Sequence, residues 1–262
     1  MDLGLREKVA IVGGASRGIG FAIARTLASE GAKVALVARR KPELERAAET
    51  IHRETGAELL IVPGDVARAG DNVRAVEETV RRFGHVDILV NNDGAPPVGP
   101  VLSFDDEAWD RAVQQNLMSV VRTVRAAVPH MPAGGGRIIN ITSTSVKQPL
   151  TGLGLSVATW AGVVGLAKTL ALELGGRGIT VNTICPGRIA TSRLEKVMTL
   201  RAQAEGRDPA DVMRRAVEEV PLGRYGSPDD VAGLVAFLAS AWGGFITGLT
   251  IPVDGGLVRS LL

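Results

Sequence analysis

The chain is poor in the side chains that most often carry chemistry. Among 262 residues it has one cysteine, one tyrosine and three histidines, and aromatic residues make up only 3%. The single cysteine, Cys185, excludes an internal disulfide, so we expect a cytoplasmic location. No cluster of His, Cys and Asp has metal-ligand spacing, and we expect no metal site. Because the only tyrosine is Tyr225, residues 1–224 offer no phenol to an active site.

Excess charge of one sign and long apolar runs are also missing. The chain has 30 basic and 28 acidic residues, interspersed, with a formal net charge of +2. This balance gives no electrostatic reason to bind nucleic acid or an anionic membrane, so a small-molecule partner is expected. No uninterrupted apolar run approaches about 18 residues, and we expect no membrane span. The first fourteen residues carry charges where a secretory signal would need its apolar stretch.

What the sequence does have is a regular alternation of apolar runs and helical patterns. Apolar runs predict seven strands, at 8–13, 33–38, 58–63, 86–91, 137–142, 179–184 and 248–253. Their continuous apolar character is typical of parallel strands covered on both faces. The pattern predicts one α/β domain over 1–262, a doubly wound seven-stranded parallel sheet with helices on both faces. Ser103 and Asp106, in capping-box spacing, predict a helix start.

One polar, helical segment interrupts this pattern before the last strand. It covers residues 188–230, and its position predicts a substrate lid at the strand ends. Arg188, Arg193 and Arg201 share this segment with several acidic residues, so they do not indicate an acidic substrate.

A glycine-rich segment, "VGGASRGIG", joins the first predicted strand to the first helix. Its glycines allow a tight turn, close approach of a pyrophosphate and packing of the helix on the strand, while the helix N-terminus attracts phosphate. This context favours a Rossmann-type dinucleotide site over glycines in an ordinary turn. The predicted phosphate-binding residues are Gly14, Ser16, Arg17, Gly18, Ile19 and Gly20.

The end of the second predicted strand favours NADP(H) over NAD(H). A cofactor with a free ribose 2′-OH would be met by an acidic residue here, but the chain has Arg39 and Arg40. A guanidinium can grip a 2′-phosphate with two N–H bonds, and Arg17 could add a third cation. The alternative is a solvated helix start.

Together with further motifs, this loop resembles the short-chain dehydrogenase/reductase family, and the 3-oxoacyl-[acyl-carrier-protein] reductases within it. "GDV" resembles the family's adenine segment, "NNDG" its Asn-Asn-Ala-Gly motif, and "CPGRIAT" its nicotinamide segment. Gly13 and Asp93 depart from the family's threonine and alanine. The resemblance implies cofactor contacts by Asp65, Val66, Asn92, Gly94, Pro186, Gly187 and Ile189.

The same resemblance identifies two catalytic positions and a deficit. "QQNLMSV" places Asn116 at the family's catalytic asparagine, and "INITS" places Ser143 at its catalytic serine. Thirteen residues after that serine the family has Tyr-x-x-x-Lys, where this chain has Ser156 and Trp160. Serine is too short and too weak an acid to replace the phenol, and tryptophan has no ionisable proton. Losing a general acid typically costs about 10²–10⁴ in rate.

Two functions therefore remain open. One is an NADP(H)-dependent oxidoreductase, acting on a 3-oxoacyl-like carbonyl or an activated double bond with a non-standard proton donor. Lys147, four residues past Ser143, is the candidate donor; the other interpretation is an exposed loop lysine. The second function is an NADP(H)-binding regulatory or structural homologue with little catalysis. The resemblance also implies a homotetramer or homodimer, with the small-faced segment 152–174 at one interface.

Five other reactive side chains are predicted to be structural. His52, His85 and His130 lie away from the carboxyl ends of the predicted strands and are expected at the surface. Cys185 is interpreted as a small apolar filler, and Tyr225 as a packing residue of the lid.

Overall fold

The computed structural model describes residues 2–261 and contains one parallel sheet of seven strands, in the order β3-β2-β1-β4-β5-β6-β7. The strands are β1 (Val9–Gly13), β2 (Lys33–Ala38), β3 (Leu59–Pro63), β4 (Ile88–Asn91), β5 (Arg137–Ile141), β6 (Thr180–Pro186) and β7 (Thr250–Val253). This confirms the predicted doubly wound, Rossmann-type sheet. The order reverses between β1 and β4, so the carboxyl ends of these strands form the crevice where such folds bind ligands.

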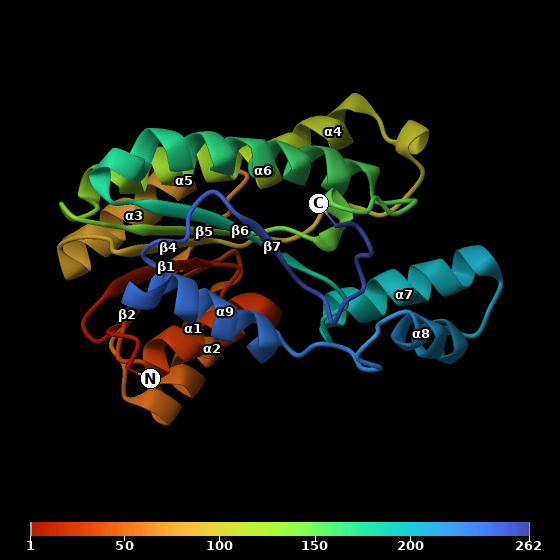
Figure 1. Ribbon diagram of the computed structural model, residues 1–262, viewed down its shortest axis with the longest axis horizontal. Helices are drawn as coiled ribbons and strands as arrows, with labels where there is room; N and C mark the ends of the chain where they lie inside the picture. The colour runs from red at the N-terminus through yellow and green to blue at the C-terminus, as the bar shows by residue number, and fades with distance from the viewer. Residues whose placement is uncertain (1, 262) are drawn as a thin grey trace.

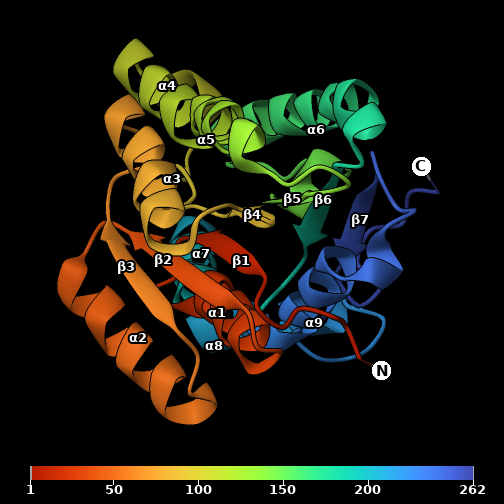
Figure 2. The same cartoon turned by 90° about the vertical axis from the view of Figure 1, so that its left-hand side faces the viewer.

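Helices cover both faces of the sheet, as predicted (Figures 1 and 2). The α-helices are α1 (Gly18–Ser29), α2 (Lys41–Thr55), α3 (Ala69–Phe83), α4 (Asp106–Ala112), α5 (Ser119–Ala127), α6 (Gly154–Leu174), α7 (Ser192–Glu205), α8 (Pro209–Glu218) and α9 (Pro228–Ala239). Helices α1, α2 and α9 pack on one face, and α3, α5 and α6 on the other. Two apolar cores result, one on each side of the sheet.

Strand β1 shows how the sequence divides between these cores. Ala10 and Val12 point into the core with α1 and α9, while Ile11 points into the core with α3, α5 and α6. All three side chains are buried because successive strand residues face opposite sides and both sides are covered. Burying a side chain such as that of Ile11 contributes about 1.5–3 kcal/mol.

Helices α7 and α8 form a small unit that stands away from the layers (Figure 1). Its base is a narrow neck, where Ala190 N–H donates to Gly226 O (2.8 Å) and Gly226 N–H donates to Arg188 O (3.0 Å). Its own apolar core includes Met198 and Ala202. Residues 228–230 of the predicted lid instead begin α9, because Ser227 and Asp230 form a capping box there.

Helix α6 is the one helix of residues 2–261 with the length and hydropathy of a membrane span, counted to Arg177. Its Val163, Ala167 and Ala171 are buried in the core on one face of the sheet. The opposite side exposes Leu172, which is 77% accessible. Packing in a protein core accounts for the apolar character of the buried side of α6.

The predicted capping box at Ser103 is wrong. Helix α4 begins three residues later, because Asp105 is its N-cap and accepts a hydrogen bond from Ala108 N–H (2.9 Å). Ser103 lies in a short 3₁₀ turn and donates to Pro100 O (2.7 Å).

Candidate cofactor and active site

The glycine-rich loop forms a cradle at the N-terminus of α1. Gly18 has a φ of 58°, in the left-handed region that favours glycine. A Cβ on Gly20 would lie 2.3 Å from Gly14 O, so no side chain fits there. The N-cap residue, Arg17, makes no side-chain capping bond, and the first turn of α1 has no acidic residue. The N–H groups of this turn therefore remain available to phosphate, which fits a dinucleotide.

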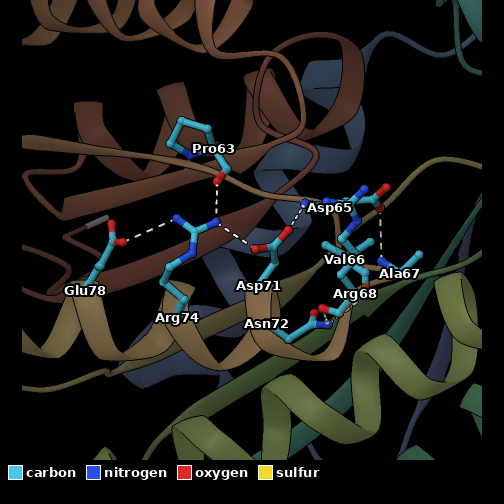
Figure 3. A network of polar contacts seen from close by, with 9 residues as sticks. All are labelled: Pro63, Asp65, Val66, Ala67, Arg68, Asp71, Asn72, Arg74 and Glu78. Atoms are coloured by element: carbon cyan, nitrogen blue, oxygen red, sulfur yellow. Dashed lines mark hydrogen bonds and ion pairs between the residues drawn. The ribbon is translucent and has the colours of Figure 1, made fainter.

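The adenine end of the predicted site is held by a polar network around the loop after β3 (Figure 3). Asp71 accepts hydrogen bonds from Asp65 N–H (2.9 Å) and from the Arg74 guanidinium (2.8 Å). Arg74 also donates to Pro63 O (2.7 Å). The hydrogen bond from Arg74 lowers the pKa of Asp71, so the carboxylate persists at neutral pH. These bonds fix the backbone of Asp65 before any ligand arrives.

A second anchor in this network holds Val66. Asn72, a buried residue of α3, donates from its amide to Val66 O (2.7 Å) and Arg68 O (2.9 Å). Asp65 accepts from Ala67 N–H (3.1 Å) and so closes its own turn. The supporting residues on α3 were not predicted, because nothing in the sequence shows that α3 reaches this loop.

The two arginines after β2 differ in the structure. Arg40 pairs with Glu43 one turn along α2 (2.7 Å), whereas Arg39 forms no ion pair with any residue in 2–261. Arg39 and Arg40 are both exposed. An exposed ion pair such as Arg40–Glu43 contributes only about 0–1 kcal/mol, so Arg40 could release Glu43 and bind another anion instead. Arg39 is therefore the more available cation for a 2′-phosphate.

The end of β6 forms the opposite wall of the crevice. Gly187 N–H donates to Val253 O (3.0 Å), and a Cβ on Gly187 would lie 2.6 Å from Asp254 Cβ. The side chain of Ile189 is buried at the neck of the α7–α8 unit. Pro186 is the last residue of β6. The three residues that the resemblance assigns to the nicotinamide side thus lie where β6 passes into that unit.

Asn116 lies in a π-helical turn, Val113–Met118, between α4 and α5. Its amide donates to Thr159 Oγ1 on α6 (2.8 Å), while its Oδ1 is buried without a protein partner among residues 2–261. Such π-turns are frequent at functional sites, where they redirect side chains. Here the turn aims Asn116 at α6.

Ser143 caps the short 3₁₀ turn that follows β5. Its Oγ accepts a hydrogen bond from Ser145 N–H (3.2 Å), so its own proton remains free to donate to a substrate oxygen. Lys147 follows the same turn and forms no ion pair with any described residue. Burial raises the pKa of the nearby Cys185 thiol, and the positive charge of Lys147 opposes part of this rise. Lys147 and Cys185 are therefore close enough to interact. Lys147 as a proton donor stays a prediction.

The two α6 positions that the sequence singles out present no ionisable group. Ser156 is 1% exposed, and its Oγ has no partner in the described structure. Trp160 is half-buried and packs against the core shared with α3 and α5. The hydroxyl of Ser156 is thus sealed inside the protein as well as being short. Nothing at either position can donate a proton to a bound carbonyl.

Comparison with known proteins identifies the family. A family model described as enoyl-(acyl carrier protein) reductase matches residues 14–258. The 3-oxoacyl-[acyl-carrier-protein] reductase of Staphylococcus epidermidis is 38% identical over 253 residues, which is 96% of this chain and 99% of that protein. The chain belongs to the short-chain dehydrogenase/reductase family.

Two solved structures illustrate the likeness of the fold. L-Sorbose reductase from Gluconobacter frateurii, complexed with NADPH and L-sorbose, is 36% identical, with a TM-score of 0.94 and full coverage of both chains. A variant of actinorhodin polyketide ketoreductase with NADPH is also 36% identical, with a TM-score of 0.92 over 97% of this chain and 98% of that one. Both of these structures contain NADPH.

One carboxyl group near the predicted cofactor site of this short-chain dehydrogenase/reductase has an unusual environment. Asp93 follows Asn92, whose amide donates to Gly13 O (3.0 Å) and joins β4 to the glycine loop. Burial raises the pKa of Asp93 to about 8, and the negative charge of the nearby Asp65 adds to the rise. A weak hydrogen bond from Ser119 and the positive charge of Arg39 lower the pKa but do not offset this rise. A carboxyl group that is neutral at pH 7 was not predicted, because burial is a tertiary property.

The remaining reactive residues lie where they were expected, with one exception. His52 and His130 are exposed, and Tyr225 donates to Met213 O (2.6 Å) within the α7–α8 unit. Cys185 is buried, with its Sγ 3.2 Å from Thr142 Oγ1. His85 is only half exposed, because its Nε2 lies 2.8 Å from the buried Asp87 at the amino ends of the strands.

Proposed function

We propose that this protein is an NADP(H)-dependent oxidoreductase that reduces a 3-oxoacyl-like carbonyl compound with a non-standard proton donor. The observation that carries this proposal is the pairing of an open phosphate cradle with a free serine hydroxyl at the same edge of the sheet. Gly20 keeps the cradle open, and Ser143 keeps its proton available. A homologue without catalytic activity would not need the free hydroxyl of Ser143.

The chain offers residues of the right chemistry to hold the cofactor. The uncapped first turn of α1, with Ser16, Gly14 and Ile19, would hold the diphosphate. Asp65 and Val66 would contact the adenine, and Arg39 the 2′-phosphate, with Arg40 and Arg17 adding charge. Asn92, Gly94 and the segment 186–189 would complete the site. The bound dinucleotide supplies hydride, and the protein supplies orientation and the proton.

The catalytic side chains divide the remaining tasks. Ser143 donates its free hydroxyl proton to the substrate carbonyl as a hydrogen bond and orients it. Asn116 has an unpartnered Oδ1 that would accept a hydrogen bond from a water. Since Ser156 and Trp160 offer no acid, the proton must come from another group, and Lys147 is the candidate that the sequence names.

A second function has one observation in its favour. The opening of α6 has an internal, unpartnered hydroxyl at Ser156 and an indole at Trp160, which suits an NADP(H)-binding regulatory or structural homologue. The two functions share the cofactor and differ in turnover. NADPH binding by fluorescence titration, followed by NADPH oxidation with ketones and 3-oxoacyl thioesters, separates them. Binding without any oxidation across the panel would establish the second function.

We further propose that the protein is a cytoplasmic homotetramer or homodimer with a small-molecule substrate, without nucleic acid or membrane. Leu172 on α6 is 77% exposed, and Phe245, before β7, is fully exposed. Large exposed apolar side chains are typical of surfaces that associate. Analytical ultracentrifugation tests this: a monomer at micromolar concentration would contradict it.

A further inference from the structure

A cavity lies beneath the cofactor-binding edge of the sheet. Its lining includes Val66 in the loop after β3, Asp93 after β4, Thr142 after β5 and Trp160 on α6. Its volume is about 40 Å³, whereas a buried water needs about 10–15 Å³. The cavity therefore has room for water between the predicted adenine end of the site and the helix that lacks a proton donor.

Four polar atoms that line this cavity are buried without a partner in the described part of the chain. They are Asn72 Oδ1, Asp93 Oδ1, Asn116 Oδ1 and Asn140 Nδ2. Buried polar atoms are almost always hydrogen-bonded, to protein or to ordered water. A cavity of this size whose lining includes several unpartnered donors and acceptors can hold water, even though apolar side chains also line it. We expect water here to satisfy these atoms and to join Asp93 to Asn116.

Burial favours the acid form of Asp93, while the hydrogen bonds from Ser119 and the Gly94 backbone lower its pKa only in part. The Oδ2 atom lies 3.4 Å from Ser119 Oγ, at the limit of a hydrogen bond, and Ser119 also donates to the closer Gln115 O. Because a serine hydroxyl has one proton, it gives Asp93 little support as a carboxylate. Of the charged groups that act on Asp93, Asp65 disfavours ionisation and Arg39 favours it, and burial outweighs both. The Oδ1 atom of Asp93 is buried although the residue as a whole is half-buried, and a pKa of about 8 favours the protonated form at neutral pH.

We propose that Asp93 is the proton source for carbonyl reduction and that it acts through water in this cavity. The inference rests on the proposed reductase function. As hydride from a reduced nicotinamide adds to the carbonyl carbon, the C–O π bond breaks and the substrate oxygen gains negative charge. The O–H bond of Asp93 then breaks, a proton passes along the water chain to that oxygen, and a carboxylate remains. Solvent restores the proton after the product leaves.

In this arrangement Asn116 is a positioning residue. Its Nδ2 is fixed by Thr159, so its Oδ1 is held toward the cavity and can orient one water. The proton donor would thus be Asp93, just after β4, rather than a residue on α6. This connects two departures from the family, the missing phenol of α6 and the extra carboxyl of "NNDG".

The protonation of Asp93 can be measured without catalysis. Infrared difference spectra of the apoprotein between pH 5 and 10 should show the C=O band of a protonated carboxyl group that disappears with a midpoint near 8. The band should be missing from Asp93→Asn and retained in Asp110→Asn, a matched change on the exposed face of α4. A wild-type spectrum without a carboxyl group that titrates above pH 6 would overturn the proposal.

The role of Asp93 is tested by steady-state kinetics on the best substrate of the carbonyl panel. Asp93→Asn should lower kcat by about 10²–10⁴, and the fall of wild-type kcat above pH 8 should vanish from the pH profile. Asp93→Ala restores the family's residue and should fold, with the same kinetic loss. Wild-type kcat and pH profile in both variants would overturn the inference alone. A wild-type protein that binds NADPH but reduces no carbonyl would overturn the proposed function and the inference with it, whatever the infrared result.

Discussion

At the residue scale, Arg39 stands at the end of β2 with its guanidinium unpaired by any described residue. Arg39→Asp should weaken NADPH binding by tenfold or more and leave NADH binding nearly unchanged, because the carboxylate would repel the 2′-phosphate. Fluorescence titration with each cofactor measures both affinities. Equal wild-type affinities for NADPH and NADH would contradict the role of Arg39, and a loss of both in the variant would indicate misfolding.

Lys147 is tested by removing its charge while keeping most of its length. If Lys147 supplies the proton, Lys147→Met should lower kcat by about 10²–10⁴ with little change in NADPH affinity. If Asp93 is the source, Lys147→Met should leave the pH–rate profile intact, and we expect this second result. Measuring kcat from pH 6 to 10 in the two single variants, Lys147→Met and Asp93→Asn, assigns the donor directly.

Asp93 should also make stability depend on pH. Its folded pKa of about 8 lies above its ordinary value of 3.8, so the folded state binds the proton more tightly than the unfolded state does. The stability from this group is fully present below pH 4 and is lost as the pH rises through 8. The difference in Tm between Asp93→Asn and wild type, measured by thermal melts, should therefore shift in favour of the variant as the pH rises from 4 to 8. A constant difference across this range would show that Asp93 is ionised in the native protein.

At the scale of elements, α6 is the helix on which the proposed function asks for an acid and the sequence has none. Residues 156 and 160 are four apart and neighbours on one face of α6. The double change Ser156→Tyr and Trp160→Lys should raise the rate of carbonyl reduction by about 10²–10⁴, because it supplies an acid and its partner together. Either single change should do much less, since the two residues act as a unit.

The double variant needs a control for space, because Ser156 is buried and Trp160 fills part of the core. Circular dichroism and NADPH titration should precede the initial-rate assays. A folded, NADPH-binding double variant without increased activity would show that the divergence from the family extends beyond these two positions.

The elements themselves were largely predictable, because long local signals specify them. The seven strands follow continuous apolar runs, and the glycine loop lies between a strand and a helix, so its position is a local property. Features created by tertiary contact were not predictable. The π-turn at Asn116, the anchoring of Val66 by Asn72 and the raised pKa of Asp93 each depend on packing between distant segments. The N-cap of α4 at Asp105 was missed because Asp105 and Ser103 are both good caps and lie within three residues of each other.

At the scale of the whole molecule, the sheet brings together groups that are far apart in the chain. The glycine loop follows β1, Asp93 and Asn116 belong to the connection between β4 and β5, and Ser143 follows β5, so three connections meet at the carboxyl edge of one parallel sheet. The α7–α8 unit is joined to this edge through a narrow neck, which suits a lid that closes over substrate. The molecule thus presents a glycine cradle and a free serine hydroxyl at one edge of the sheet, while α6 has no ionisable group at Ser156 or Trp160.

The central claim is that this protein transfers hydride from NADPH to a carbonyl carbon although Ser156 and Trp160 on α6 offer no acid. The most direct measurement is mass spectrometry of the product after incubation with deuterated NADPH, labelled on either face of C4, and a 3-oxoacyl thioester. We predict a slowly accumulating 3-hydroxyacyl product with deuterium from one face only. Bound NADPH with no deuterium in any product, across the thioester and ketone panel, would contradict the claim.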